Sequence, residues 1–307
     1  MIKLSIIIPV YNSSKILEKL ITEINSNVSN KFEKDYEIIL VNDSSKDNSW
    51  VVIKKISREF DFVKGIDLNN QFLDKQTVTG VSIDTRTIQK GDLFIALRGK
   101  NFNGNTFSEL AIKKGASGII TDDKATAIKF SSLLVNDTYK TLKNLAIFAR
   151  KRFEGKVIAI TGSNGKTSTK NMLSSSLNLF GKTHSTFENN NNFLGLCLTL
   201  LRLKKNFEYC VIELGMNKKN ELKRLSKIAN PNSIIITNVS SSHIGNFKSE
   251  QQIAEEKSEI FNGILPNGNI ILNADDKWFN FLKHKALQHT KNVYSFGKKS
   301  NSKLKIK

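Results

Sequence analysis

A glycine-bearing turn near the middle of the chain limits what this sequence can fold into. The turn, residues 162–166, follows an apolar run of strand length at residues 157–161 and precedes a helical pattern at residues 167–180. A strand, a tight turn and a helix in this order surround a phosphate-sized site with backbone N–H groups and the positive end of the helix dipole. The order predicts a parallel-sheet, nucleotide-binding α/β domain.

The turn ends in Gly165, Lys166 and Thr167, the ending of a phosphate-binding loop. In such a loop the lysine reaches the β- and γ-phosphates and the threonine hydroxyl holds Mg²⁺. The full pattern would need a glycine where Ile160 stands, but the context favours a phosphate loop over a plain turn with a solvated lysine. The residues expected to bind the nucleotide here are Gly162, Ser163, Asn164, Gly165, Lys166, Thr167 and Ser168.

Three more polar residues could serve the same site. Glu213 ends an apolar strand predicted at residues 209–213, and a carboxylate at the carboxyl end of a strand suits Mg²⁺, which prefers oxygen ligands. His243 follows a strand predicted at residues 233–237, and Lys257 lies in a helical segment. Taken singly, the three would be an ordinary strand-end glutamate, a structural histidine and a surface lysine.

Strands and helices alternate through most of the chain, which favours parallel sheets with right-handed crossovers. Besides the strands above, we predict strands at residues 4–10, 36–41, 62–68, 78–83, 92–97, 119–120, 133–135 and 269–272, and helices near 16–24, 50–56, 106–114 and 141–153. A polar patch near residues 69–75 separates two kinds of pattern. The expected domains are residues 1–72, 73–153 and 154–307, and we expect a frayed tail at 298–307.

Composition narrows the class of protein. The net charge of +19, from 47 Lys and Arg against 28 Asp and Glu, would attract anionic ligands such as nucleotides. The lysines are scattered without an RNA-binding aromatic signature, so we expect no nucleic-acid partner. Cys197 and Cys210 cannot form a disulfide framework, and apolar stretches such as residues 194–201 are far shorter than the ~20 residues of a membrane helix. With no visible signal peptide, we expect a reduced cytoplasmic protein without an integral membrane segment.

Several motifs follow one another in a fixed order. They are residues 162–167, residues 189–192, residues 212–215, His243, residues 257–261 and residues 273–276. This series resembles the Mur ligases of peptidoglycan synthesis over about residues 75–296. Residues 82–86 and 90–99 resemble the N-terminal substrate domain of the members that join D-alanyl-D-alanine to UDP-N-acetylmuramoyl-tripeptide.

The resemblance implies an acyl-phosphate mechanism. ATP would phosphorylate the tripeptide carboxylate, and the amine of D-alanyl-D-alanine would then attack. In family terms Lys166, His243 and Lys257 are catalytic, and two Mg²⁺ ions are held by Thr167, Glu213, His243 and Lys257. Lys257 matches a lysine that CO₂ carbamylates, which turns a cation into an anionic metal ligand. Positioning and charge neutralisation would supply most of the catalysis.

The resemblance also implies further binding residues and a monomer. Asn273 matches a position near the nucleotide. The residues that match substrate-binding positions are Ser82, Asp84, Thr85, Arg86, Asn191 and Asn192.

The chain departs from the family pattern in places. Glu188 replaces a glycine, Leu194 an isoleucine and Cys197 a proline, and a family Asp-Gly-His pattern reads Asn103-Gly104-Asn105. A Gly-x-His-Asn segment and an arginine-bearing third domain are not seen before Lys307. We therefore expect that this chain alone cannot ligate.

The beginning of the chain resembles another family. Residues 4–12 and 37–49 resemble the start of a family 2 glycosyltransferase, over about residues 1–72. The resemblance implies that Asp43 contacts the nucleotide of a sugar donor. The alternatives to a ligase are therefore a glycosyltransferase that uses a nucleotide sugar, or a non-catalytic nucleotide-binding fusion.

The expected fold class is α/β. It combines an incomplete GT-A-like βαβ segment, a small α/β substrate domain and a parallel-sheet P-loop ATP-binding domain truncated at its C-terminal end.

Overall fold

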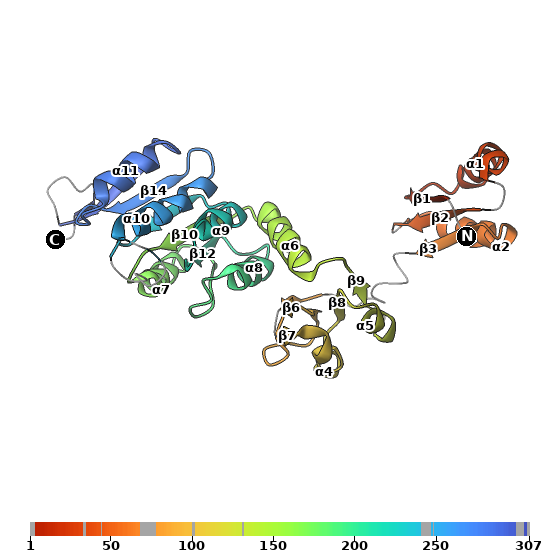
Figure 1. Ribbon diagram of the computed structural model, residues 1–307, viewed down its shortest axis with the longest axis horizontal. Coiled ribbons are helices and arrows are strands. Elements are labelled where there is room, and N and C mark those ends of the chain that lie inside the picture. Colours follow the sequence, from red (N-terminus) through yellow and green to blue (C-terminus); the bar gives the residue numbers. More distant parts are fainter. Residues whose placement is uncertain are drawn as a thin grey trace. The chain divides into compact units, whose positions relative to one another are not determined.

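The computed structural model describes residues 4–32, 35–43, 45–67, 78–99, 102–130, 132–240, 247, 249–298 and 304–305 (Figure 1). Within these residues the chain is a mixed α/β protein whose strands form three sheets, built mainly from parallel pairs, and one short hairpin. Two compact units are present, residues 1–79 with 83–136 and residues 80–82 with 137–307. The expected α/β class is confirmed.

The first sheet has three parallel strands in the order β1-β2-β3. Its strands are β1 (Leu4–Val10), β2 (Tyr36–Asn42) and β3 (Val63–Asp67), and its helices are α1 (Leu17–Phe32) and α2 (Ser49–Glu59). Side chains of β2 alternate between buried and half-buried positions, and both helices contribute to the one buried cluster. The strands agree with the prediction, but α1 continues to Phe32, more than two turns beyond the predicted helix.

The second sheet is small and has the order β4-β5-β8-β9. Its strands are β4 (Gly80–Ser82), β5 (Asp92–Ile95), β8 (Gly118–Thr121) and β9 (Leu133–Leu134). The predicted helix near 106–114 is a 3₁₀ turn, η1 (Gly104–Phe107), followed by α4 (Ser108–Lys113). The hairpin of β6 (Arg98–Gly99) and β7 (Phe102–Asn103) and the helix α5 (Lys124–Lys129) were not predicted from the sequence.

The third sheet has seven parallel strands in the order β11-β12-β10-β13-β14-β15-β16. The strands are β10 (Lys156–Thr161), β11 (Thr183–Ser185), β12 (Tyr209–Glu213), β13 (Ser233–Ile236), β14 (Asn269–Asn273), β15 (Val293–Gly297) and β16 (Leu304–Lys305). β11, β15 and β16 were not predicted. Because β16 pairs with β15, the prediction of a frayed tail is wrong for Leu304 and Lys305.

Helices precede β10 and connect the strands from β10 to β15, and they cover the sheet (Figure 1). They are α6 (Thr138–Arg152), α7 (Lys166–Leu177), α8 (Phe193–Leu201), α9 (Glu221–Ala229), α10 (Glu250–Ser258), the 3₁₀ turn η3 (Glu259–Gly263) and α11 (Phe279–Leu287). α6, α8 and α9 pack against one another, and α7 packs on β10 and β12. In the part of the chain that is described, no helix has the length and apolar character needed to cross a membrane.

Candidate functional site

The glycine-bearing turn lies at the switch point of the seven-stranded sheet. β10 is hydrogen-bonded to β12 on one side and to β13 on the other. Along the chain, β11 and β12 are added on one side of β10 and β13 to β16 on the other, so the strand order reverses at β10. Open α/β sheets bind ligands at such a point, beyond the carboxyl ends of the strands. α7 begins there at Lys166, and its first N–H groups have no partner within the helix.

Close packing against the segment after β13 fixes the shape of the turn. A Cβ on Gly162 would lie 1.8 Å from Thr237 Oγ1, so only glycine fits. Thr237 Oγ1 donates to Asn164 O at 2.7 Å, and Asn164 N donates to Asn238 Oδ1 at 2.9 Å. Ser163 Oγ donates to Ser240 O at 3.1 Å. The turn is therefore held from outside, and Gly165, at φ +77°, leads into α7.

The Lys166 ammonium lies over this turn. It donates to Gly162 O at 2.9 Å and to Ser163 O at 3.2 Å. Partial burial lowers the pKa of Lys166, and the nearby Glu213 carboxylate opposes that shift. Lys166 thus places one positive charge at the N-terminal end of α7.

Glu213 is the buried acid of the site, with 1% of its surface exposed. Its Oε2 accepts from Thr167 Oγ1 at 2.8 Å, and its Oε1 accepts from Asn191 Nδ2 at 2.9 Å. The fold therefore brings together three residues that lie far apart in sequence. A hydroxyl and a carboxylate are oxygen donors of the kind that Mg²⁺ prefers, so this pair fits the expected metal. Among the described residues, no group of three or more His, Cys, Asp and Glu side chains could hold a metal ion.

Lys257 is buried on α10, with 1% of its surface exposed, so its interpretation as a surface lysine is wrong. Burial, and to a smaller extent the charge of Lys166, lower its pKa to about 7. No hydrogen bond or ion pair to its ammonium is found within the described part of the chain. Lys257 is thus a buried amine that loses its proton at a lower pH than an exposed lysine does.

The remaining residues predicted for this site have different surroundings in the structure. Asn273 Nδ2 donates to Thr237 O at 3.1 Å, which ties β14 to the segment that holds the turn. Asn192 caps α8 by accepting from Gly195 N at 3.0 Å. Ser168 is exposed on α7. His243 lies outside the described residues.

The substrate residues predicted at positions 82–86 lie at the end of β4, which finishes at Ser82, and in the loop that follows it. Ser82 and Thr85 are buried, and Lys114 Nζ donates to Thr85 O at 2.8 Å. Arg86 lies against Asp84 with Nη2 and Oδ2 2.6 Å apart, and this hydrogen bond lowers the pKa of Asp84. The guanidinium itself is largely exposed, so this pair forms part of the loop surface.

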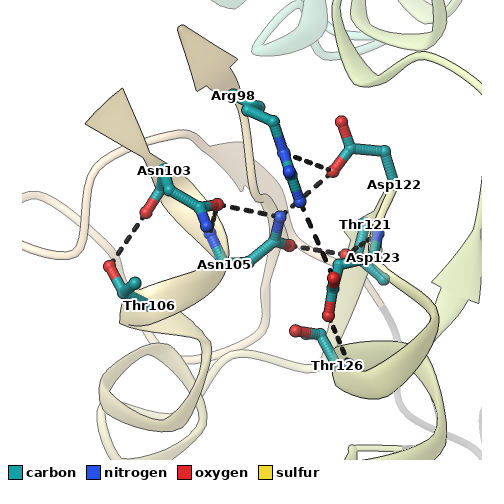
Figure 2. Close-up of polar contacts among 8 residues, drawn as sticks. All are labelled: Arg98, Asn103, Asn105, Thr106, Thr121, Asp122, Asp123 and Thr126. Carbon is teal, nitrogen blue, oxygen red and sulfur yellow. Dashed lines mark hydrogen bonds and ion pairs between the residues drawn. The ribbon is translucent and has the colours of Figure 1, made fainter. Parts of the chain in front are cut away.

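A polar network fixes the neighbouring segment of the same unit (Figure 2). Asn105 Nδ2 donates to Asn103 Oδ1 at 3.0 Å and to Asp122 Oδ1 at 3.1 Å, and Asn105 Oδ1 accepts from Thr121 Oγ1. Arg98 pairs with the same Asp122. Both polar side-chain atoms of Asn105, which stands where the family pattern has a histidine, are therefore hydrogen-bonded within this network. The network was not predicted from the sequence.

Asp43 of the first sheet follows β2 and is exposed. Its backbone N donates to Val10 O at 2.9 Å, which joins the ends of β1 and β2. This is the carboxyl edge of that sheet, where the sequence places it.

The residues that hold the glycine-bearing turn, and the buried Lys170 of α7, were not predicted from the sequence. Thr237, Asn238 and Ser240 form a short polar run directly after β13, and Lys170 lies one helical turn after Lys166. The polar run after a strand was a usable signal, whereas the burial of Lys170 depends on packing.

Three protein-family models match the chain. Residues 160–307 match the Mur ligase middle domain, residues 77–157 match the Mur ligase family catalytic domain, and residues 5–83 match glycosyl transferase family 2.

Individual proteins agree with these matches. A UDP-N-acetylmuramoyl-tripeptide–D-alanyl-D-alanine ligase of Buchnera aphidicola is 38% identical over 237 residues, which is 77% of this chain and 51% of that protein. The crystal structure of MurF from Acinetobacter baumannii superposes with a TM-score of 0.65 at 35% identity, over 72% of this chain and 48% of that one. MurF ligase of Thermotoga maritima in complex with ADP gives 0.64 at 30% identity, over 74% and 52%. The chain spans about half the length of these relatives.

Proposed function

Because residues 77–157 and 160–307 of this chain belong to the Mur ligase family, we propose that they are the precursor-binding and ATP-binding parts of a peptidoglycan ligase. The proposed substrates are UDP-N-acetylmuramoyl-tripeptide, D-alanyl-D-alanine and ATP. The names of the relatives support the first two, and the ADP complex of one relative supports the third.

The proposed reaction joins an acid to an amine in two steps. The terminal phosphoryl group of ATP passes to the tripeptide carboxylate, which forms an acyl phosphate and releases ADP. The amine of D-alanyl-D-alanine then attacks the acyl carbon, the amide bond forms, and phosphate and a proton leave. Both steps move negative charge between oxygens, so fixed positive charge and positioning are what the protein must supply.

The hydrogen bond between Thr167, in the first turn of α7, and Glu213 is the observation that carries this proposal. Lys166 and the first N–H groups of α7 would hold the phosphates. Thr167 and Glu213 would hold Mg²⁺, with His243 as a further proposed ligand, and the ion would neutralise charge on the phosphates. Asn273, through Thr237, would keep the turn in position beside the nucleotide.

We extend the proposal to a carbamate on Lys257. Its burial, and the lack of an acidic partner in the described part of the chain, favour a neutral amine. The lone pair of that amine would attack the carbon of CO₂, and one proton would leave the nitrogen. The product is a carbamate anion at Lys257, within the electrostatic influence of the positive charge of Lys166.

Nucleotide binding tests the proposal directly. We expect calorimetry to detect ATP binding in the presence of Mg²⁺, and Lys166→Ala to weaken it roughly 10- to 100-fold because a charged hydrogen-bond donor is lost. Lys151→Ala, on the exposed surface of α6, is the matched control and should bind like the unchanged chain. Equal binding by the Lys166 variant would refute the assignment, and ADP release that requires both precursor substrates measures ligation itself.

The first sheet supports a second candidate function, transfer of a sugar from a nucleotide donor. The observation that favours it is the family match over residues 5–83, with Asp43 at the carboxyl edge of the sheet. It predicts UDP-sugar binding that Asp43→Ala removes and Lys166→Ala leaves intact.

The setting follows from the proposed substrates. A ligase that uses ATP and a UDP-linked precursor works in the cytoplasm, and we propose a monomer with domains at residues 1–72, 73–153 and 154–307. Residues 68–77, where the first boundary falls, lie outside the described part of the chain.

A further inference from the structure

A second buried lysine lies next to the site and has no part in the chemistry above. Lys170, on α7, has 2% of its surface exposed. Its ammonium donates to Thr186 O at 2.8 Å and to Glu188 O. Burying a cation is unfavourable unless it is hydrogen-bonded, so these two backbone carbonyls are the groups that keep it there.

Both carbonyls belong to the loop that joins β11 to α8, residues 186–192. Glu188 adopts φ +48° in this loop, a left-handed conformation that is strained for a residue with a Cβ. The bond from Lys170 to Glu188 O therefore holds a backbone conformation that the loop would not keep easily by itself.

The same loop sets the position of the Glu213 carboxylate. Thr186 Oγ1 accepts from the backbone N of Glu213 at 3.1 Å, and Asn191 Nδ2 donates to Glu213 Oε1 at 2.9 Å. Asn191 O also accepts from Gly215 N at 2.8 Å. Glu213 is thus held at its backbone and at one oxygen by a loop that Lys170 fastens to α7.

The other oxygen of Glu213 is held by α7 itself, through Thr167. Thr167 and Lys170 lie one turn apart on this helix, so one rigid element determines both sides of the carboxylate. We propose that Lys170 is a positioning residue that sets the orientation of Glu213 for Mg²⁺ by fastening the 186–192 loop to the nucleotide helix. This inference rests on the proposed function, because it assumes that Glu213 binds the metal.

Mg²⁺-dependent ATP binding tests the inference in solution. With Lys170→Met, the Mg²⁺ concentration at half-maximal ATP binding should rise about tenfold, the usual effect of removing a group that orients a metal ligand. Asn191→Ala should do the same. The double variant should need no more Mg²⁺ than either single variant, because both substitutions remove the same support of Glu213 by the 186–192 loop. Lys151→Met is the control with no change expected.

Amide hydrogen exchange without nucleotide gives a second readout. Lys170→Met should speed the exchange of the Asn191 and Gly215 amides, while amides of α9 keep the rate of the unchanged chain. If the unchanged chain binds no ATP, the proposed function fails, and this exchange experiment still decides whether Lys170 holds the loop.

Two results would overturn the inference. One is a folded Lys170→Met variant whose loop amides keep their protection. The other is a loosened loop with an unaltered Mg²⁺ requirement, which would make Lys170 a structural residue only. Should the methionine variant not fold, Lys170→Gln keeps one donor and is judged by the same two readouts.

Discussion

Burial gives Lys257 a chemistry that the many surface lysines of this chain do not share. Its pKa of about 7 means that a large fraction of the side chain is the neutral amine near neutral pH, whereas an exposed lysine is almost wholly charged. Only the neutral form has a lone pair to react with CO₂. The reactivity proposed for this residue therefore follows from where α10 places it.

The carbamate can be observed without any turnover. In ¹³C-bicarbonate at pH 8, we expect one protected carbamate carbon signal in the NMR spectrum of the protein, because an enclosed carbamate exchanges slowly with solvent. Lys257→Met should lose the signal and Lys151→Met should keep it. A signal that survives in the Lys257 variant would assign the carbamate to another amine.

His184 gives a prediction about pH. It lies on β11 with Nε2 3.1 Å from Thr199 O, and burial lowers its pKa. The unfolded chain therefore binds a proton at a higher pH than the folded chain does, so the free energy of unfolding falls as pH drops below about 6.5, the ordinary histidine value. In urea unfolding between pH 7.5 and 5, the free energy of unfolding of the His184→Gln variant should depend less on pH than that of the unchanged chain.

The exposed His284 on α11 supplies the matched control for that experiment. His284→Gln should leave the pH dependence of the free energy of unfolding as it is in the unchanged chain. A His184→Gln variant with the same slope as the unchanged chain would contradict the assignment.

Sequence patterns could predict the residues to which we assign the chemistry better than the residues that support them. Lys166, Thr167 and Glu213 follow from a strand, a turn and a helix in order. Lys170 could not be predicted, because only packing shows that its ammonium meets backbone carbonyls.

At the scale of elements, the turn between β10 and α7 is the most tightly constrained piece of the site. The approach of Thr237 to Gly162 leaves no space for a side chain. A short run after β13 thus shapes the loop that precedes α7, and the two connections act as one unit.

A substitution pair can measure this constraint. Gly162→Ala should destabilise the protein by about 1–3 kcal/mol, the usual range for overpacking, and weaken ATP binding more than tenfold by displacing the turn. Thr237→Ala removes the crowding oxygen, so the double variant should recover part of the loss in thermal unfolding and in calorimetry. Strictly additive losses would show that the two residues do not meet.

The element-level predictions were closest for strands with a dominant apolar run, and they missed β11, β15 and β16. β1, β10 and β12 have continuous apolar runs and lie within a residue of their predicted bounds. β11 has only three residues, Thr183–Ser185, and forms because β12 offers it a hydrogen-bonded edge. Such a strand depends on a partner distant in sequence, so local pattern carries no signal for it.

For the whole molecule, the net charge of +19 is the property most relevant to an anionic nucleotide. Charge spread over a surface attracts such ligands over distances comparable to the Debye length, about 10 Å at 0.1 M salt. The sequence could predict this effect fully, since it depends on composition more than on fold.

Salt should therefore weaken nucleotide binding. Raising NaCl from about 50 to 500 mM should increase the dissociation constant of ATP by roughly five- to tenfold, and that of uncharged adenosine by much less, because screening acts on the charge of the ligand. Calorimetry with both ligands at fixed Mg²⁺ measures the difference. Equal salt slopes for ATP and adenosine would contradict a long-range contribution.

The two hydrogen bonds that Lys166 makes with its own turn have a consequence for selectivity among anions. An incoming anion must replace two carbonyl partners that the ammonium already has, so a net gain requires several new bonds at once. Chloride or a single carboxylate offers few, while a polyphosphate also engages the N–H groups of α7. The carbonyl groups of the turn thus compete with an incoming anion for the Lys166 ammonium. This competition discriminates against the small anions that are abundant in any cell.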